Sequence, residues 1–239
     1  MIAPVIRYAK RGIVWYQGEH NAGRAFAYRE ILPALIRSWR EASGDENLPF
    51  IIVQLPAYAS PGKGDDWPVL RESQQVTHQA VMNTALVVTI DHGEKDNIHP
   101  ADKQPVGERI ALETRRLIYG EKVAGCGPLY AGCAAAGASI IVRFAGPGGT
   151  GVPPVGLCAR GKPNVGEAPM PLEGFAIAGA DHKFVPASAV LCDGAVVVSS
   201  PAVAKPVAVR YAWSNWPTVS LFDVNGLPAA PFRTDDWEK

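Results

Sequence analysis

The 239-residue sequence lacks the features that mark several large classes of protein. No apolar run approaches the roughly 18 residues needed to span a bilayer, so the sequence does not predict a membrane protein. Lys and Arg together number 23, as do Asp and Glu, and no basic block occurs. Because a nucleic-acid partner requires a basic surface that faces phosphates, we expect neither nucleic acid nor a membrane as a partner.

Cysteine is also scarce, and no pair of cysteines forms a C-x-x-C motif, which argues against a zinc ribbon or a redox site. The four cysteines are Cys126, Cys133, Cys158 and Cys192. We expect free, buried thiols, with one disulfide, Cys126–Cys133, as the alternative for an exported protein. Residues 1–11 do not form a signal peptide, because their charges follow a short apolar stretch. The protein is therefore expected either to be cytoplasmic or to lack its true N-terminus.

Apolar residues, in contrast, make up 47% of the chain, which is enough for a core. Residues 1–120 alternate between strand-like and helix-like patterns, which predicts an α/β domain with a parallel sheet covered by helices. The predicted strands cover 12–16, 50–55 and 85–90, and the predicted helices follow residue 21 and cover 69–82 and 102–119. Asn21 is the expected N-cap of the first helix, and Pro33 is expected to kink or split it.

Residues 121–239 lose this helical periodicity and are expected to form a second, β-rich domain with antiparallel strands. Short strands are predicted at 139–144, 174–177, 195–198 and 207–213. Fourteen of the 29 residues from 146 to 174 are Gly or Pro, which predicts a long loop in that segment.

A carboxylate and an imidazole stand three residues apart, as Asp96 and His99, after the strand predicted at 85–90. A serine hydrolase needs an imidazole to accept the hydroxyl proton and a carboxylate to orient that imidazole. Sites of open α/β sheets lie beyond the carboxyl ends of the strands. The pair is therefore a candidate for a catalytic base and its partner, and the alternative is a helix-entry loop with a surface histidine.

A polar turn, Gln-Gly-Glu-His-Asn at residues 17–21, directly follows the first predicted strand. Gly18 permits a tight turn, and the side-chain amides of Gln17 and Asn21 offer N–H groups that stabilise an oxyanion. The turn is therefore a candidate oxyanion or substrate-binding region. The alternative is a plain strand–helix connection in which Asn21 is only a cap.

Several segments, taken in order across nearly the whole chain, resemble the SGNH-type sialate O-acetylesterase family. They are residues 1–24, with Trp-Tyr-Gln-Gly-Glu-His-Asn-Ala at 15–22, Leu-Arg-Glu-Ser-Gln at 70–74, Ile-Asp-His-Gly-Glu-Lys-Asp-Asn-Ile-His-Pro at 90–100, Gln-Pro-Val-Gly-Glu-Arg at 104–109, and the tail segments 210–217 and 226–235. So many separate matches in the same order make the resemblance specific.

The resemblance implies a partial three-layer α/β/α SGNH hydrolase-like domain at 1–120, followed by a β-rich, sandwich-like region at 121–239. It implies hydrolysis of O-acetyl esters on sialic acid or related sugars by a Ser-His-Asp mechanism, without a cofactor or metal. By the same resemblance, His99 is the general base, Asp96 is its partner, and Gln17 lies near the oxyanion.

The resemblance also draws attention to Arg71, which lies in one of the matching segments together with Glu72 and Gln74. Glu19 follows an apolar strand, so it needs a cationic partner if it is buried, and Arg71 or Arg24 are candidates. These residues either line the substrate pocket or form a structural ion pair with Glu19, and the sequence leaves both options open.

Two departures from the family pattern stand out. His20 occupies a position where the family usually has a small hydroxyl residue, and we expect its ring to point to solvent. The family's nucleophile lies in a Gly-x-Ser-Asn type motif, which this sequence does not contain, and Ser38, Ser43, Ser60 and Ser73 do not resemble activated nucleophiles. The chain alone is therefore expected to be close to inactive, because loss of such a nucleophile costs on the order of 10⁶ in turnover.

The missing nucleophile strand also bears on association. A three-stranded parallel sheet without its central strand exposes an apolar edge, and such edges pair with other chains. We therefore expect marginal stability, self-association, or a partner chain that carries the missing N-terminal part, in addition to an O-acetylated sugar substrate.

Two other functions compete with the esterase. Trp213, Trp216 and Trp237 favour a non-catalytic carbohydrate-binding or scaffold protein, because aromatic faces stack on sugar rings, although core packing also explains them. A dense set of donors favours a metal site, but their spacing matches no helix-borne ligand pair. These donors are Asp91, His92, Glu94, Asp96 and His99.

Overall fold

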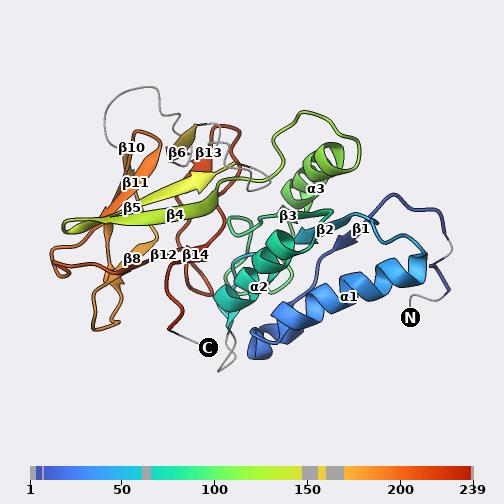
Figure 1. Ribbon diagram of the computed structural model, residues 1–239, viewed down its shortest axis with the longest axis horizontal. Coiled ribbons are helices and arrows are strands. Elements are labelled where there is room, and N and C mark those ends of the chain that lie inside the picture. The colour runs from blue at the N-terminus through green and yellow to red at the C-terminus, as the bar shows by residue number, and fades with distance from the viewer. Residues whose placement is uncertain (1–3, 7, 61–65, 147–155, 160–169, 238–239) are drawn as a thin grey trace. The chain divides into compact units, whose positions relative to one another are not determined.

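A computed structural model describes residues 4–6, 8–60, 66–146, 156–159 and 170–237 of the chain. The chain divides into two compact units, Met1–Cys126 and Gly127–Lys239. The first unit combines helices with a parallel sheet, whereas the described elements of the second are all strands (Figure 1). Across the described ranges, no helix has both the length and the apolar character that crossing a membrane requires.

The first unit is built around a parallel sheet of order β1-β2-β3. Its elements in chain order are β1 (Ile13–Trp15), the 3₁₀ helix η1 (Glu19–Arg24), α1 (Tyr28–Ser43), β2 (Phe50–Val53), α2 (Trp67–Ala80), β3 (Thr84–Val87) and α3 (Gln104–Leu117). The three strands predicted from the sequence are present and parallel, in register Ile13↔Phe50 and Phe50↔Thr84. β1 lies at an edge of this sheet, where Val14 is 48% exposed.

The two faces of the sheet are covered by different helices, because successive side chains of a strand point to opposite faces. One face packs on α3 through a buried cluster of Ile51, Val53, Ala85, Val87 and Val106. On the other face, the ring of Trp39 in α1 lies 6.3 Å from that of Phe50 and 5.6 Å from that of Trp15. Figure 1 shows α1 and α3 on opposite sides of the strands, which confirms the expected three-layer α/β/α arrangement.

Two local predictions for the first helix are wrong. α1 begins at Tyr28 after Ala27, without a side-chain cap, while Asn21 lies inside η1 and its Oδ1 accepts from Gln17. The helix also runs through Pro33 without a break. Pro33 lies in the second turn, where one backbone hydrogen bond is lost, and the buried stripe that includes Ile36 outweighs that loss.

The second unit is formed by antiparallel strands in three sheets, of order β4-β5-β11-β10-β7, β14-β12-β8-β9 and β13-β6. The strands are β4 (Leu129–Ala136), β5 (Ser139–Ala145), β6 (Leu157–Ala159), β7 (Met170–Leu172), β8 (Phe175–Ala178), β9 (Val185–Pro186), β10 (Ser188–Cys192), β11 (Ala195–Ser199), β12 (Ala208–Tyr211), β13 (Leu221–Asp223) and β14 (Phe232–Arg233). The ring of Phe232 in β14 lies 4.8 Å from Tyr130 and 5.8 Å from Phe144, so aromatic packing joins the two larger sheets. The predicted β-rich second half is confirmed.

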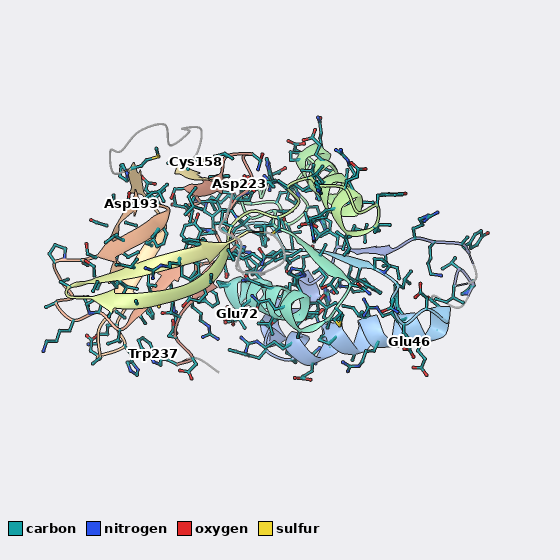
Figure 2. All side chains as sticks on the ribbon, turned by 45° about the horizontal axis from the view of Figure 1, so that its top comes forward. Glu46, Glu72, Cys158, Asp193, Asp223 and Trp237 are labelled. Atoms are coloured by element: carbon teal, nitrogen blue, oxygen red, sulfur yellow. The ribbon has the colours of Figure 1, made fainter. Side chains whose placement is uncertain are left out.

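The segment from 146 to 174, expected to be one long loop, contains two short strands. β6 pairs with β13, and β7 pairs with β10. Cys158 of β6 donates from Sγ to the carbonyl of Asp223 in β13, and Figure 2 labels both residues. Strand pairing with distant segments overrides a local composition unfavourable to strands, and Pro171 is tolerated because β7 is an edge strand. The rest of the predicted loop, 147–155 and 160–169, lies outside the described residues.

The four cysteines carry free thiols, as expected. Cys126 and Cys158 are buried, Cys192 is partly buried, and Cys133 is exposed, so the expectation of buried thiols holds for only part of the set.

Candidate functional site

The carboxyl ends of the three parallel strands lie at one edge of the sheet, and Gln74 from α2 joins two of them. Its Nε2 donates to the carbonyls of Gln17, at 3.1 Å, and Val53, at 3.3 Å. Its Oε1 accepts from the amide of Leu55 at 3.0 Å. The fully buried Gln74 side chain therefore holds the turn after β1 against the end of β2.

A directed chain of hydrogen bonds orients the side chains of the turn after β1. Trp15 Nε1 donates to the hydroxyl of Tyr28, which donates to Gln17 Oε1, both at 2.9 Å. Gln17 Nε2 then donates to Asn21 Oδ1 at 2.9 Å. Burial, with a smaller contribution from the charge of Glu19, raises the pKa of Tyr28 to about 12 against the opposing Trp15 hydrogen bond. The Tyr28 proton is therefore retained, and it fixes the direction of the chain.

The last member of this chain presents a donor. Because Asn21 accepts through Oδ1, its Nδ2 carries the two N–H groups, and Nδ2 has no hydrogen-bond partner in the part of the chain that the structure describes. Gln17 and Asn21 thus lie in direct contact, with one amide oriented by the other. Their role at an oxyanion stays a prediction.

Gly18 and Glu19 are engaged with each other. The Gly18 amide donates to Glu19 Oε2 at 2.9 Å. An oxyanion would therefore have to displace this carboxylate to bind the Gly18 N–H group. Gly18 has φ 155°, and a Cβ at this position would lie 2.5 Å from Leu70 Cδ2, which explains the requirement for glycine. The neighbouring His20 is exposed, in agreement with the expected solvent-facing ring.

Arg71, expected either in the pocket or in an ion pair with Glu19, is completely buried in α2. Its guanidinium donates to the carbonyls of Leu55, at 3.0 Å, and Pro56, at 2.8 Å, and so supports the chain just after β2. Burial lowers the pKa of Arg71 to about 9, and the charge of Asp66 opposes that effect. The guanidinium therefore stays charged at neutral pH.

A buried ion pair anchors the segment after β3. Arg109 of α3 donates to both carboxylate oxygens of Asp91, at 2.6 and 2.8 Å, and to the carbonyl of Val88 at 2.7 Å. The Asp91 and Arg109 side chains are 4% and 9% exposed. His92 Nε2 lies 3.4 Å from Asp91 Oδ2. The sequence did not predict the Asp91–Arg109 pair, although Arg109 is the last residue of the segment 104–109 that resembles the family.

Further contacts hold the backbone of the loop at residues 91–101. A Cβ on Gly93 would lie 1.8 Å from the carbonyl oxygen of Ala57, so the two backbones approach as closely as glycine allows. Glu94 accepts from Asn97 Nδ2 at 2.9 Å and from the amide of Ala101 at 2.5 Å, which closes the turn between them. The Ala101 amide, followed by Asn97, holds the pKa of Glu94 below its ordinary value.

Asp96 and His99 occupy this turn, and both are exposed. No hydrogen bond joins their side chains in the described structure, where the amide of His99 instead donates to Asn97 Oδ1 at 3.0 Å. Lys103, four residues beyond His99, has its Nζ 5.3 Å from the ring centroid of Tyr16, next to the turn after β1. The loop thus ends near that turn, but the catalytic assignment of Asp96 and His99 stays a prediction.

The donors considered for a metal site do not form a cluster. Among the residues that can be described, no three His, Cys, Asp or Glu side chains are placed to hold one metal ion. Asp91 and His92 instead belong to the contact around Arg109, and Glu94 closes the turn.

Comparison with known proteins shows what this chain is similar to. Residues 3–114 match a family described as carbohydrate esterase, sialic acid-specific acetylesterase. Over this stretch the chain is similar to that family. Sialate O-acetylesterases from Homo sapiens and Mus musculus are each 36% identical to it over 140 residues, which is 51% of this chain. The match covers 27% of the human protein and 26% of the mouse protein, so the chain corresponds to about a quarter of their length.

A solved structure of the carbohydrate esterases extends the likeness over both units. A carbohydrate acetylesterase from Xanthomonas citri superposes with a TM-score of 0.88 at 40% sequence identity. The alignment covers 98% of this chain and 52% of that protein. The fold expected from the resemblance to the esterase family is therefore confirmed.

Proposed function

We propose that this chain acts in the hydrolysis of O-acetyl esters on sialic acid or a related sugar, by a Ser-His-Asp mechanism. The match of residues 3–114 to the carbohydrate esterase family supports an ester hydrolase, and the similar proteins from Homo sapiens and Xanthomonas citri are a sialate O-acetylesterase and a carbohydrate acetylesterase. The substrate in this proposal is an O-acetylated sugar, and no cofactor takes part.

The observation that carries the proposal is the oriented amide chain after β1. It ends at Asn21 Nδ2, a donor preorganised at the carboxyl edge of the sheet, where an acetyl oxyanion is to be stabilised. In the proposed mechanism, His99 accepts the proton of a serine hydroxyl and later protonates the departing sugar oxygen, while Asp96 stabilises the imidazolium. Catalytic hydrogen bonds often tighten only when substrate binds, which is compatible with the open Asp96–His99 geometry.

The nucleophile is the second part of the proposal. The 239 residues contain no Gly-x-Ser-Asn motif. Ser73 is buried and its hydroxyl donates to the carbonyls of Ala25 and Val69, and that of Ser43 donates to Trp39. We propose that these 239 residues alone turn over at a rate reduced by on the order of 10⁶, because without the serine the covalent step is lost.

Acetate release from p-nitrophenyl acetate tests both parts. We would compare the 239-residue chain, a longer version that includes a Gly-x-Ser-Asn segment, and His99→Ala and His92→Ala variants of that version. The proposal expects turnover only from the longer version, with loss of turnover in His99→Ala. His92→Ala is the matched control, because this histidine lies on the same loop.

The opposite results are equally informative. If His92→Ala abolishes turnover and His99→Ala does not, the base is assigned to the wrong histidine. If the 239-residue chain turns over as fast as the longer version, the serine argument is wrong and another nucleophile must be sought within the chain.

A further inference from the structure

The four-stranded sheet of the second unit has a row of side chains on one face. The strand registers pair Arg233 of β14 with Arg210 of β12, Arg210 with Ala176 of β8, and Ala176 with Pro186 of β9. Directly paired residues of antiparallel strands project to the same face of a sheet. The row therefore runs from two arginines to a small residue and a proline.

A pocket of about 380 Å³ lies over the part of this row formed by Arg210, Ala176 and Pro186. Ala176 contributes only a methyl group to it, which leaves a hollow between the larger side chains. Phe184 and Trp213 line the pocket together with Arg210, and the polar residue Thr218 belongs to the same lining. Pockets of this volume, largely apolar with a few polar groups, are typical small-molecule sites.

Cation–π contacts between two arginines and the aromatic rings hold the walls of the pocket in place. The Arg210 guanidinium lies 4.1 Å from the centroid of the Phe184 ring and 5.7 Å from that of Trp213, and Arg233 lies 5.2 Å from Trp213. Buried Asp235 accepts from Arg210 at 2.9 and 2.6 Å. This pairing balances the Arg210 charge and orders the walls in the absence of any ligand, which lowers the entropy cost of binding.

The other two tryptophans of this region are placed differently. Trp237, labelled in Figure 2, stacks on His182 with ring centroids 3.8 Å apart and an interplanar angle of 6°, and it is not among the residues that line the pocket. Trp216 is 42% exposed but does not line the pocket. Trp213 is therefore the tryptophan of this group that is both partly exposed and part of the pocket wall.

We propose that this pocket is a carbohydrate-binding site for a single pyranose ring of a neutral saccharide. The C–H face of such a ring is apolar and packs on an aromatic wall, while its hydroxyl groups reach polar groups at the pocket edge. A neutral ring fits because Asp235 pairs at 2.6 Å with Arg210, the arginine that lines the pocket. Arg233 lies 3.9 Å from the same carboxylate but is not among the lining residues. The site binds sugar without ester chemistry, so it does not depend on the turn after β1 or on His99.

The test is a titration of the full chain, followed by tryptophan fluorescence and calorimetry. The probes are the neutral oligosaccharides cellotetraose, xylotetraose and mannotetraose, with N-acetylneuraminic acid as the anionic comparison. We expect at least one neutral probe to bind, and we expect Trp213→Ala to weaken that binding at least tenfold. Trp216→Ala, which removes a tryptophan three residues away, is the matched control and should bind as the unchanged chain does.

A second variant protects the test against misfolding. Ala176→Leu keeps every aromatic residue but fills the hollow, so it should also abolish binding while the circular dichroism spectrum is retained. The proposal is overturned if no neutral probe binds, if only N-acetylneuraminic acid binds, or if Trp216→Ala weakens binding as much as Trp213→Ala. Since no ester is cleaved in this assay, its outcome is independent of the proposed esterase activity.

Discussion

The turn at residues 17–21 and the loop at residues 91–101 both follow strands of the same parallel sheet, yet they are ordered in different ways. In the turn, the candidate side chains themselves are held, since Tyr28 orients Gln17 and Gln17 orients Asn21. In the loop, the backbone is held by the Asp91–Arg109 pair and by close approach at residue 93, while the candidate side chains remain exposed.

This difference separates two requirements of acyl transfer. Stabilising an oxyanion requires donors that are already oriented when charge develops, and the amide of Asn21 in the turn after β1 is oriented by Gln17. A general base must exchange a proton with two partners during the reaction, so an imidazole with rotational freedom on a fixed backbone is compatible with its task.

The largest effect is expected from Arg109→Ala, which leaves the Asp91 carboxylate buried without its partner. Breaking a buried pair from one side costs about 3–5 kcal/mol, so the free energy of unfolding should fall by that amount in urea denaturation. Arg115→Ala is the control on the same helix, because both Arg115 and its partner Glu121 are exposed and solvent screens such pairs, so little stability should be lost. If the two variants lose the same free energy of unfolding, Arg109 does not anchor the loop.

A smaller loss is expected from Gly93→Ala, where a Cβ would overlap the carbonyl of Ala57. Overpacking of this kind costs about 1–3 kcal/mol, and the backbone of the loop must shift to relieve it. The NMR chemical shifts of the Asp96 and His99 backbone amides should therefore change, because they report this movement of the backbone. Gly107→Ala is the control, since no atom lies within 4 Å of a Cβ in this position of α3, and the change should stabilise the helix by up to about 1 kcal/mol. Unchanged amide shifts in Gly93→Ala would show that the contact does not position the loop.

The turn is tested by Tyr28→Phe, which keeps the ring and removes the hydroxyl. Trp15 then loses an acceptor and Gln17 Oε1 loses a donor, at a cost of about 1 kcal/mol in the free energy of unfolding. The side-chain amide resonances of Gln17 and Asn21 should broaden or merge as the amides gain freedom. Tyr119→Phe, at an exposed residue, is the control and should leave both resonances as they are. Sharp, unshifted amide signals in Tyr28→Phe would mean that the hydrogen-bond chain does not orient the turn.

The smallest effect concerns Glu94, whose pKa is held below its ordinary value of 4.5 by the Ala101 amide and the side chain of Asn97. A lowered folded-state pKa means that this contribution is present above the unfolded-state value and is lost as the pH falls through the folded-state value. Amide hydrogen exchange at Ala101, corrected for its intrinsic pH dependence, should therefore lose protection in acid. Glu94→Gln should abolish this loss of protection in acid. If the unchanged chain and the variant lose protection at the same pH, the transition belongs to another titrating group.

Sequence patterns predicted the elements whose signal is local. The apolar runs near residues 50 and 85 became strands buried on both faces, which continuous apolar runs match, and the run near residue 13 became the edge strand of the same sheet. The long loop predicted at residues 146–174 is interrupted by two strands whose signal is not local. β6 and β7 form because they pair with β13 and β10, and not because of their own composition. Asn21 was misplaced as a helix cap because its side chain binds Gln17.

Within the candidate site, the sequence pointed to the residue types but not to their partners. The spacing of Asp96 and His99 suggested a carboxylate–imidazole contact, whereas in the structure Asp91 lies beside His92 and both Asp96 and His99 face solvent. Whether two side chains meet depends on how the loop is closed, and Glu94 closes this loop through contacts that the spacing does not reveal.

The sequence by itself determined the α/β and β-rich halves, the polar residues that follow each strand, and the resemblance to an esterase family, because these depend on local order along the chain. Only the tertiary structure decided that Arg109 holds Asp91, that Tyr28 orients Gln17, and that Ala176 lies between Arg210 and Pro186. Such contacts join residues far apart in sequence. They depend on strand register and helix packing, which the energy of the whole fold selects and no short segment encodes.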